Sequence, residues 1–485
     1  MTESSIDAII EKINITLETG LFINRKNEAE EEKKKTEEFI KYFCANIEKQ
    51  SRLFRIVWKL NESGKWNGKK DKLNTHIQTK YKVDKRTANS LIQSVIGRKK
   101  ALLELKKTEL SDLKTQQEAL NKEIEKIIVE INKIKPIVAI NKATEKVLAA
   151  YRKNKHSLFN KKRKLNRISH KIKKLEKQIN EKRFKICWGT KKLFNAQHWL
   201  EENKFDSKAE WRNSFIQTRD NQVNYIGCAS EPCGNQNCQL SYCEATDSFH
   251  LRVRKDLELM EHKDDKFFII EGIDFKYQRD KLIELLKRNE TPITIRILRR
   301  GARWYLQVII TWANAPEQRV TNKDDGVIGL DFNSGFIQMA EADSSGNLIK
   351  LRKFQLEHHG TGNKANSEIC EVVSEITKYA VTKRKSIVIE DLDFRQKKAK
   401  TSRAKGNKGK FYNKMIHSLD YSRYSKTIKN ATHRNNTELI YIDPAYTTKI
   451  GESKYSKLMK LNSHQAAAFV IARRGMGYID TVKMS

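Results

Sequence analysis

The alternation of apolar and polar positions divides the first two thirds of the chain into helical and β-rich stretches. Residues 1–50 carry an early apolar stripe at Ile6, Ile9, Ile10 and Ile13, which predicts a helix, and Leu53–Trp58 has the composition of a strand. From residue 222 to residue 312, strict alternation at Phe249–Arg254 and Ile293–Ile297 predicts short strands joined by turns. We therefore expect an N-terminal helix and a first barrel strand in residues 1–60, and a small β-barrel in residues 216–320.

Residues 61–215 have the clearest helical periodicity. Two sets of apolar residues follow a 3-4 spacing, and Pro136 and the polar stretch 153–157 separate them: Leu110, Leu113, Leu120, Ile124, Ile127, Ile131 and Ile134, then Leu165, Ile168, Ile172, Leu175 and Ile179. This spacing predicts an antiparallel coiled-coil hairpin. We expect a helical region inserted into the barrel domain. A coiled coil is also a common oligomerisation device, so a homodimer is one expected assembly.

The last 160 residues follow a mixed α/β order. Apolar runs predict a strand ending at Asp331, a second over residues 336–342 and a third over residues 348–354 after a turn at residues 343–347. A helical stripe, a strand ending at Glu390, a basic loop with a helix, a strand at residues 439–442 and a helix from Asn462 come next. Three antiparallel strands, then helix, strand, helix, strand and helix is the order of a ribonuclease H core. The fold class expected for the whole chain is therefore α+β and multidomain.

The charge balance indicates a polyanionic partner. The chain has 96 Lys and Arg against 60 Asp and Glu, a net charge of +36, and residues 152–185 alone hold 15 cationic residues against two acidic ones. Such self-repulsion does not stabilise a fold, and ordinary solvated coiled coils mix signs, so nucleic acid is the natural partner. A generally basic protein from a Lys-rich proteome is the alternative. No apolar run is long enough to span a membrane and no signal pattern opens the chain, so we expect a cytoplasmic protein of a low-GC prokaryote without membrane partners.

The seven cysteines predict free thiols rather than a disulfide framework, since the chain has no export signal. Four of them recur every five residues, at Cys228, Cys233, Cys238 and Cys243. Structural zinc sites usually pair their ligands two residues apart, so this spacing argues against bound zinc. The surrounding residues instead have the composition of strands and a turn.

Three segments of the last region carry candidate chemistry. Asp331 and Glu390 each end a buried strand, and His464 lies in the first turn of the last helix. Side chains brought together in this way can hold a pair of divalent cations about 4 Å apart, an arrangement that hydrolyses phosphodiesters in line.

These segments resemble the RuvC domain of TnpB transposon nucleases and of the type V CRISPR effectors derived from them. Gly329–Asn333 with Gly335 matches the first motif, Ile389–Leu392 the second, and Asp443–Thr448 the segment before the third. The resemblance covers residues 325–480, and it implies a ribonuclease H-like nuclease domain over residues 321–485. It also implies that residues 216–320 form a wedge-like barrel and that residues 61–215 form a recognition region.

The resemblance implies an RNA-guided DNA endonuclease, with guide RNA and both double-stranded and single-stranded DNA as partners. Mg²⁺ or Mn²⁺ would be held by Asp331, Glu390 and His464, which are also the expected catalytic residues. The expected nucleic-acid-binding residues are basic positions of the second coiled-coil helix and of the loop after Glu390: Lys161, Lys162, Arg163, Lys164, Arg167, Lys171, Lys397, Lys398, Arg403 and Lys405.

Two departures from the family pattern leave alternatives open. His464 stands where the family has its third aspartate, and imidazole is a weak ligand for Mg²⁺, although it can act as a general base. The family's paired-cysteine zinc knuckle is absent around residues 449–455, so no structural zinc is expected. An RNA-guided DNA-binding protein without nuclease activity and a transposon-associated, guide-independent nuclease therefore remain as alternatives.

Overall fold

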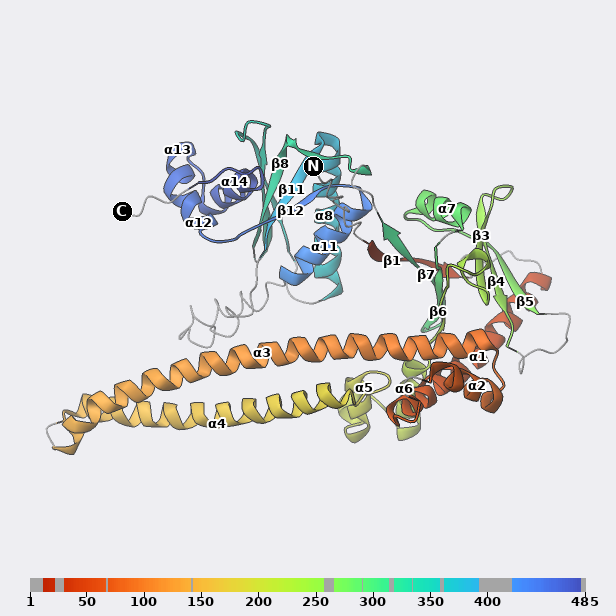
Figure 1. Cartoon of the computed structure of the whole chain (residues 1–485), viewed down its shortest axis with the longest axis horizontal. Helices are drawn as coiled ribbons and strands as arrows, with labels where there is room; N and C mark the ends of the chain where they lie inside the picture. Colours follow the sequence, from red (N-terminus) through yellow and green to blue (C-terminus); the bar gives the residue numbers. More distant parts are fainter. Residues whose placement is uncertain are drawn as a thin grey trace, which may run out of the picture. The chain divides into compact units, whose positions relative to one another are not determined.

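The computed structural model describes residues 12–21, 30–66, 69–140, 143–256, 266–289, 291–313, 318–333, 335–357, 362–391 and 421–480. It is a mixed α+β structure in which the described strands form three sheets (Figure 1). The chain separates into two compact units. The first combines residues 109–174 with residues 313–485, and the second combines residues 12–108 with residues 175–312.

The last third of the chain is built on a five-stranded sheet with the order β10-β9-β8-β11-β12. Its strands are β8 (Asn322–Asn333), β9 (Phe336–Ala342), β10 (Leu348–Gln355), β11 (Lys385–Glu390) and β12 (Leu439–Ile442). The first three pair antiparallel, whereas β11 runs parallel to both β8 and β12. This is the order of strands that the apolar pattern predicts, including the strand that ends at Glu390.

Helices cover both faces of this sheet. One core joins the sheet to α8 (Asn363–Lys383) and α11 (Tyr421–Arg434), and a second core on the opposite face joins it to α14 (Ser463–Gly475) (Figure 1). Between β12 and α14 the chain forms α12 (Thr447–Ile450), the π-helix η7 (Gly451–Ser456) and α13 (Lys457–Met459). Side chains of β8 contribute to both cores, because a strand directs successive side chains to opposite faces of the sheet.

A buried ion pair lies within this sheet. The Lys385 Nζ donates to Glu341 Oε1 at 2.7 Å, and the Tyr379 hydroxyl donates to Glu341 Oε2 at 2.7 Å. Glu341 and Lys385 are only 3% and 7% exposed, so neither charge is well hydrated. The pair links the far end of β9 to the start of β11, and its hydrogen bonds offset the cost of burying both groups.

The second unit contains two further sheets that share one core. The four-stranded sheet has the order β1-β7-β6-β2 and the three-stranded sheet has the order β3-β4-β5. Their strands are β1 (Lys12–Leu21), β2 (Gln222–Tyr225), β3 (Cys238–Cys243), β4 (Ser248–Arg254), β5 (Phe267–Ile273), β6 (Thr294–Arg300) and β7 (Arg303–Ala313). Short helices η3 (Pro232–Gly234) and α7 (Arg279–Arg288) connect them. The predicted β-rich region is thus present as two sheets over a common core.

The prediction for the N-terminal region is wrong in two places. Leu53–Trp58 is not a strand but part of the helix α1 (Glu30–Glu62), because Leu53, Val57 and Trp58 recur at helical spacing and are buried on one face. The early strand is instead β1, where Ile15 and Leu17 are buried between exposed polar neighbours. The predicted helical stripe contributes Ile13 to this strand, and Ile6, Ile9 and Ile10 lie outside the described residues.

The remaining helices form a separate apolar cluster and a long hairpin. Residues of α1, α2 (Lys70–Tyr81) and the start of α3 (Lys85–Ala139) pack together with Phe184. The segment after α4 (Glu145–Glu181) contains α5 (Lys191–Asn195), η1 (Ala196–His198), η2 (Glu201–Asn203) and α6 (Lys208–Arg219).

Helices α3 and α4 form the predicted hairpin and lie side by side (Figure 1). Gln117 bonds to Ser169, Glu123 to Lys161 and Glu130 to Asn154, so positions rise along α3 as they fall along α4, and the pair is antiparallel. The predicted break points are wrong: α3 continues through Pro136, and residues 153–157 are helical. Pro136 lies in the last turn of α3, where the backbone hydrogen bond that a proline removes is close to the end of the helix.

Among the described residues, every helix is either too short or too polar to span a bilayer.

Candidate active site

Asp331 and Glu390 lie on neighbouring parallel strands. In the pairing of β11 with β8, Ile389 is opposite Leu330, so the next residues of the two strands are Glu390 and Asp331. Leu330 and Ile389 are buried in the core under α8 and α11. Because side chains alternate, the two carboxylates extend to the other face, which α14 covers. The sheet register therefore brings two acids from positions 59 residues apart onto one face.

Close packing of α14 against β8 brings His464 to the same edge. A Cβ atom added to Gly329 would lie 2.3 Å from the Ala468 carbonyl oxygen and 2.5 Å from the Ala472 nitrogen, so the helix touches the strand backbone. A capping box at Asn462 and Gln465 fixes where this helix begins. Its first turn, which carries His464, is consequently held beside the end of β8.

Asp331 has two partners in this pocket. Its Oδ2 lies 3.2 Å from His464 Nδ1 and accepts a hydrogen bond from Asn333 Nδ2 at 2.8 Å. The Asp331 side chain is 15% exposed and that of His464 is 46% exposed, so the pair lies at the surface end of the α14 face. The Phe336 ring meets the imidazole edge to face, with 5.1 Å between ring centroids, and limits its rotation.

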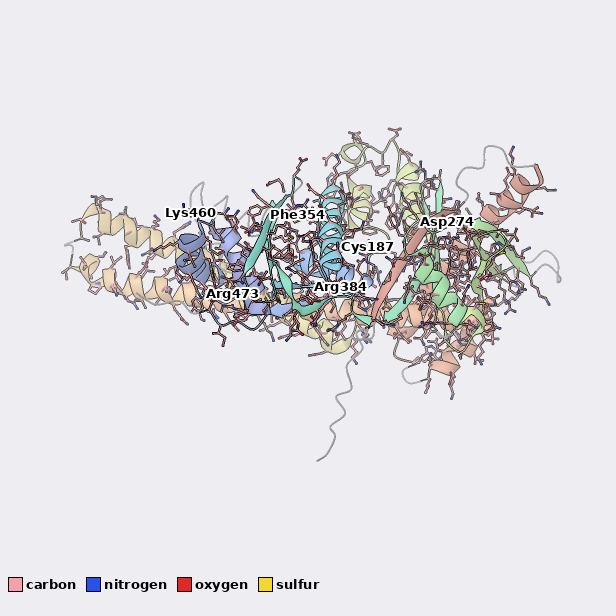
Figure 2. The ribbon with its side chains drawn as sticks, turned by 90° about the horizontal axis from the view of Figure 1, so that it is seen from above. Cys187, Asp274, Phe354, Arg384, Lys460 and Arg473 are labelled. Atoms are coloured by element: carbon pink, nitrogen blue, oxygen red, sulfur yellow. The ribbon has the colours of Figure 1, made fainter. Side chains whose placement is uncertain are left out.

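Glu390 is oriented by the segment that follows β12. The Thr447 hydroxyl donates to Glu390 Oε1 at 2.5 Å, and Thr447 is buried at the start of α12. Arg474 near the end of α14 donates to the carbonyl oxygens of Asp443 and Ala445, which anchors this segment to the helix. In Figure 2, the two ends of this helix can be found from the labels of Lys460, just before α14, and Arg473, near its end. The last helix thus supports both acidic positions.

The electrostatics of the pocket favour the charged form of His464. The hydrogen bond with Asp331 raises the pKa of the imidazole, and the Asp331 and Glu452 charges act in the same direction. Partial burial and the Lys353 charge lower that pKa but are outweighed. The pocket therefore stabilises the imidazolium form of His464 relative to its neutral form.

The donor set fits one kind of metal ion. Among the residues that the structure describes, no three His, Cys, Asp or Glu side chains gather closely enough to hold a metal by themselves. Mg²⁺ does not require such a cage, since it keeps several waters and usually takes one or two carboxylates plus substrate phosphates. Asp331 and Glu390 offer two carboxylates on one partly exposed face. The residues present therefore fit Mg²⁺ that is completed by a phosphate group.

The predicted nucleic-acid-binding residues differ in their surroundings. Lys161 is turned toward α3, where its Nζ lies 2.5 Å from Glu123 Oε2. The other five predicted positions of α4 are exposed: Lys162, Arg163, Lys164, Arg167 and Lys171. The loop positions Lys397, Lys398, Arg403 and Lys405 lie outside the described residues.

The four regularly spaced cysteines extend from the segment before η3 to the end of β3 in the second unit. Cys238 is completely buried at the start of β3, and Cys243 ends the same strand. Cys228 forms a contact with the Ser230 hydroxyl, and Cys233 adopts a left-handed backbone conformation in η3. All seven cysteines are free thiols.

Sequence reasoning missed the residues that position the site. Asn333 and Thr447 belong to segments that resemble family motifs, but their hydrogen bonds to Asp331 and Glu390 depend on contacts that no local pattern reveals. The signal that was present is the small-residue run Ala466–Ala468 opposite Gly329, which is typical of a helix that approaches a strand closely.

Comparison with known proteins adds little to this geometry. No protein-family model matches the chain, and no curated protein matches its sequence. Among solved structures, a chain of a cryo-EM structure of a CRISPR-Cas12f ternary complex aligns over 95% of this chain and 98% of its own length. The two share 12% sequence identity with a TM-score of 0.22, and a likeness at that level supports no conclusion about fold or function.

Proposed function

We propose that the protein is an RNA-guided DNA endonuclease whose nuclease site is of the RuvC type. The observation that carries the proposal is the placement of Asp331 and Glu390 on adjacent parallel strands, on the face covered by the helix that carries His464. The strand order β10-β9-β8-β11-β12, with α8 and α11 on one face and α14 on the other, is that expected of a ribonuclease H-like domain. The motif resemblance of the segments around Asp331 and Glu390 also supports the proposal.

In this proposal Asp331 and Glu390 hold Mg²⁺ or Mn²⁺ against the scissile phosphate. A bound divalent cation would stabilise the charge that develops on the phosphate and lower the pKa of an attacking water. Asn333 and Thr447 keep the two carboxylates aimed at the shared face through hydrogen bonds of 2.8 and 2.5 Å. Outer partners of this kind typically change activity by about 10- to 100-fold when they are removed.

His464 supplies proton transfer in this scheme. Its Nδ1 is directed to Asp331, whereas its Nε2 makes no hydrogen bond with any residue in the described part of the chain. An imidazole held by a carboxylate through one nitrogen can give or take a proton through the other, as general acid–base catalysis requires. With 46% of its side chain exposed, His464 is accessible to a substrate.

The basic character of the chain supports the guided part of the proposal. A net charge of +36 favours binding of a guide RNA and of DNA through phosphates. In guided recognition, base pairing with the RNA reads the target sequence and the protein reads only a short flanking motif in the duplex. Double-stranded DNA would be bound first, and the displaced single strand afterwards.

The decisive experiment uses the full chain purified with the RNA that it retains. Sequencing that RNA identifies the guide, and a plasmid carrying the matching sequence is incubated with the complex in Mg²⁺ and then in Mn²⁺. We expect metal-dependent cleavage that Asp331→Asn abolishes. Asp391→Asn is the matched control, because Asp391 is an exposed acid next to Glu390 on the same strand end. Absence of a discrete RNA would instead favour a guide-independent nuclease.

A second candidate function is guided DNA binding without cleavage. The contact between Asp331 and His464 favours it, because a protonated imidazole at 3.2 Å neutralises the carboxylate that the metal needs. Target binding without cleavage in either metal would support this candidate. Cleavage that first appears in His464→Asp would show that the histidine had disabled an otherwise intact site, and His464→Asn controls for loss of the imidazole alone.

A further inference from the structure

The exposed side of α4 is rich in cationic residues, although Lys161 among them pairs with Glu123 of α3. Between Arg152 and Lys174 the helix has eleven lysines and arginines and no acid: Arg152, Lys153, Lys155, Lys161, Lys162, Arg163, Lys164, Arg167, Lys171, Lys173 and Lys174. The antiparallel stretch of α3 is balanced, with five cations and six acids over residues 109–135. The charge asymmetry is therefore a property of α4 alone.

Seven residues define what we call the outer row of α4. They follow one another at intervals of three or four, opposite the seam positions Leu165, Ile168 and Ile172, and all are exposed: Arg152, His156, Phe159, Arg163, Arg167, His170 and Lys174. At a rise of 1.5 Å per residue, the row extends over about 33 Å. It forms a straight, accessible strip on one side of the hairpin.

The cations of the outer row have no acidic partners. Arg152, Arg163, Arg167 and Lys174 form no ion pair with any residue in the described ranges. Like charges at i and i+4, such as Arg163 and Arg167, destabilise a helix. Nothing within the hairpin compensates for this repulsion, so a polyanion that binds the row would relieve it.

Phe159 is a second and independent sign of a ligand. Its side chain is 59% exposed on the side of α4 away from the apolar seam, where it contributes nothing to the hairpin core. The Arg163 guanidinium lies over its ring, 5.6 Å from the centroid. An aromatic ring beside an arginine within a basic strip is suited to stack on a nucleobase.

We propose that the outer row of α4 binds a double-stranded stem of RNA, with Phe159 placed to stack on an unpaired base next to that stem. Two histidines, His156 and His170, lie among the cations of the row, and their ring nitrogens can form hydrogen bonds. The wide, shallow minor groove of an A-form helix presents 2′-hydroxyl groups that such side chains can contact, and B-form DNA has none. The inference rests on the proposed function only in naming RNA as the polyanion.

The test measures binding of the full-length chain, stripped of nucleic acid, to a synthetic RNA hairpin with a fully paired 16-base-pair stem. A DNA hairpin of the same sequence is the comparison, and fluorescence anisotropy is recorded at several KCl concentrations without divalent metal. One variant replaces Arg152, Arg163, Arg167 and Lys174 by Gln. The matched control replaces four exposed lysines of α3 by Gln: Lys122, Lys126, Lys133 and Lys135.

We expect the outer-row variant to lose affinity for the RNA hairpin by about tenfold or more, and its salt slope to fall by up to about 3.6, since each of four phosphate contacts contributes about 0.9. The α3 variant should bind nearly as well as the unchanged chain. Equal losses in the two variants, or equal affinity for the RNA and DNA hairpins, would overturn the proposal. Circular dichroism checks that both variants remain helical.

Phe159 is tested with a second RNA hairpin that has one unpaired adenine beside the stem. Phe159→Ala should weaken binding to this probe by at least about fivefold, the lower bound for a stacked base, and leave binding to the fully paired hairpin unchanged. An equal effect on both probes would contradict the stacking role. Neither probe contains target DNA, so a negative result here is distinct from a failure of DNA cleavage.

Discussion

Replacing Gly329 by alanine should separate the last helix from the sheet. The new Cβ would lie 2.3 Å from the Ala468 carbonyl oxygen, and Cβ atoms essentially never come closer than 3.0 Å to another heavy atom. The helix must therefore move by at least the difference between these distances, about 0.7 Å, because the obstructing atoms belong to its backbone and cannot rotate away. Overpacking of this kind costs about 1–3 kcal/mol of folding free energy, and rigid backbone contact favours the upper end.

Activity should decrease as well as stability. His464 lies in the first turn of the displaced helix, and its Nδ1 must stay near Asp331 Oδ2, 3.2 Å away. A misplacement of about 1 Å at a catalytic group can lower the rate by about 100-fold. We expect Gly329→Ala to reduce cleavage of a matched target by a factor between about 10 and 100.

The assay combines urea unfolding with hydrogen exchange of the α14 amides, so that the loss can be assigned to this region of a multidomain chain. Gly97→Ala is the control, because no heavy atom lies within 4 Å of its added Cβ. That change, in the middle of α3, should stabilise by up to about 1 kcal/mol through helix propensity. Unchanged stability and unchanged exchange at α14 in Gly329→Ala would refute the proposed close packing.

Two further substitutions and the removal of divalent cations test other parts of the structure. Thr447→Val should lower cleavage by about tenfold by releasing Glu390, whereas Thr447→Ser should retain it; equal activity of the two would exclude the hydrogen bond. Burial alone raises the pKa of Glu341, but the hydrogen bonds from Lys385 and Tyr379 lower that pKa below its usual value. The ionised Glu341 therefore stabilises the fold above the pKa of the unfolded state, and this stabilisation is lost as pH falls through the pKa of the folded state. Glu341→Gln should therefore lower the free energy of unfolding by about 3 kcal/mol at pH 7, and its difference from the unchanged chain should shrink below pH ~4. A difference in urea unfolding that stays constant with pH would contradict this. Removing divalent cations with EDTA should stop cleavage but leave binding of the RNA hairpin intact, and parallel losses of both would argue against a metal confined to the nuclease site.

The sheet that carries the candidate site was predictable because two of its central strands are continuous apolar runs that end directly on an acid. The stretches that contain Val327–Leu330 and Ile387–Ile389 are buried on both faces, and their acids follow directly. Pattern alone therefore indicated both strands and both carboxylates. The approach of His464 to Asp331 was expected from the motif order, but its distance depends on the packing at Gly329, which is a tertiary contact.

The N-terminal region was mispredicted because short apolar stretches are ambiguous. Leu53–Trp58 contains residues that favour strands, yet it lies inside a 33-residue helix whose buried face it supplies. The true strand β1 forms the edge of a sheet whose other members lie more than 200 residues later in the chain. The alternation of Ile15 and Leu17 with polar residues is a local strand signal, but the strands that pair with β1 are too distant in sequence to support it.

The hydrogen bond between Gln117 and Ser169 fixes the register of α3 against α4 in the hairpin. At 2.9 Å the two side chains satisfy each other within an otherwise apolar seam, and sliding one helix by a heptad would leave each facing hydrocarbon. Adding one heptad to both helices beyond this contact would preserve the alignment and move the tip outward by about 10.5 Å. The length of the hairpin can therefore be changed in steps of one heptad. Engineered insertions of this size would move its tip without changing the side chains that its existing surface presents.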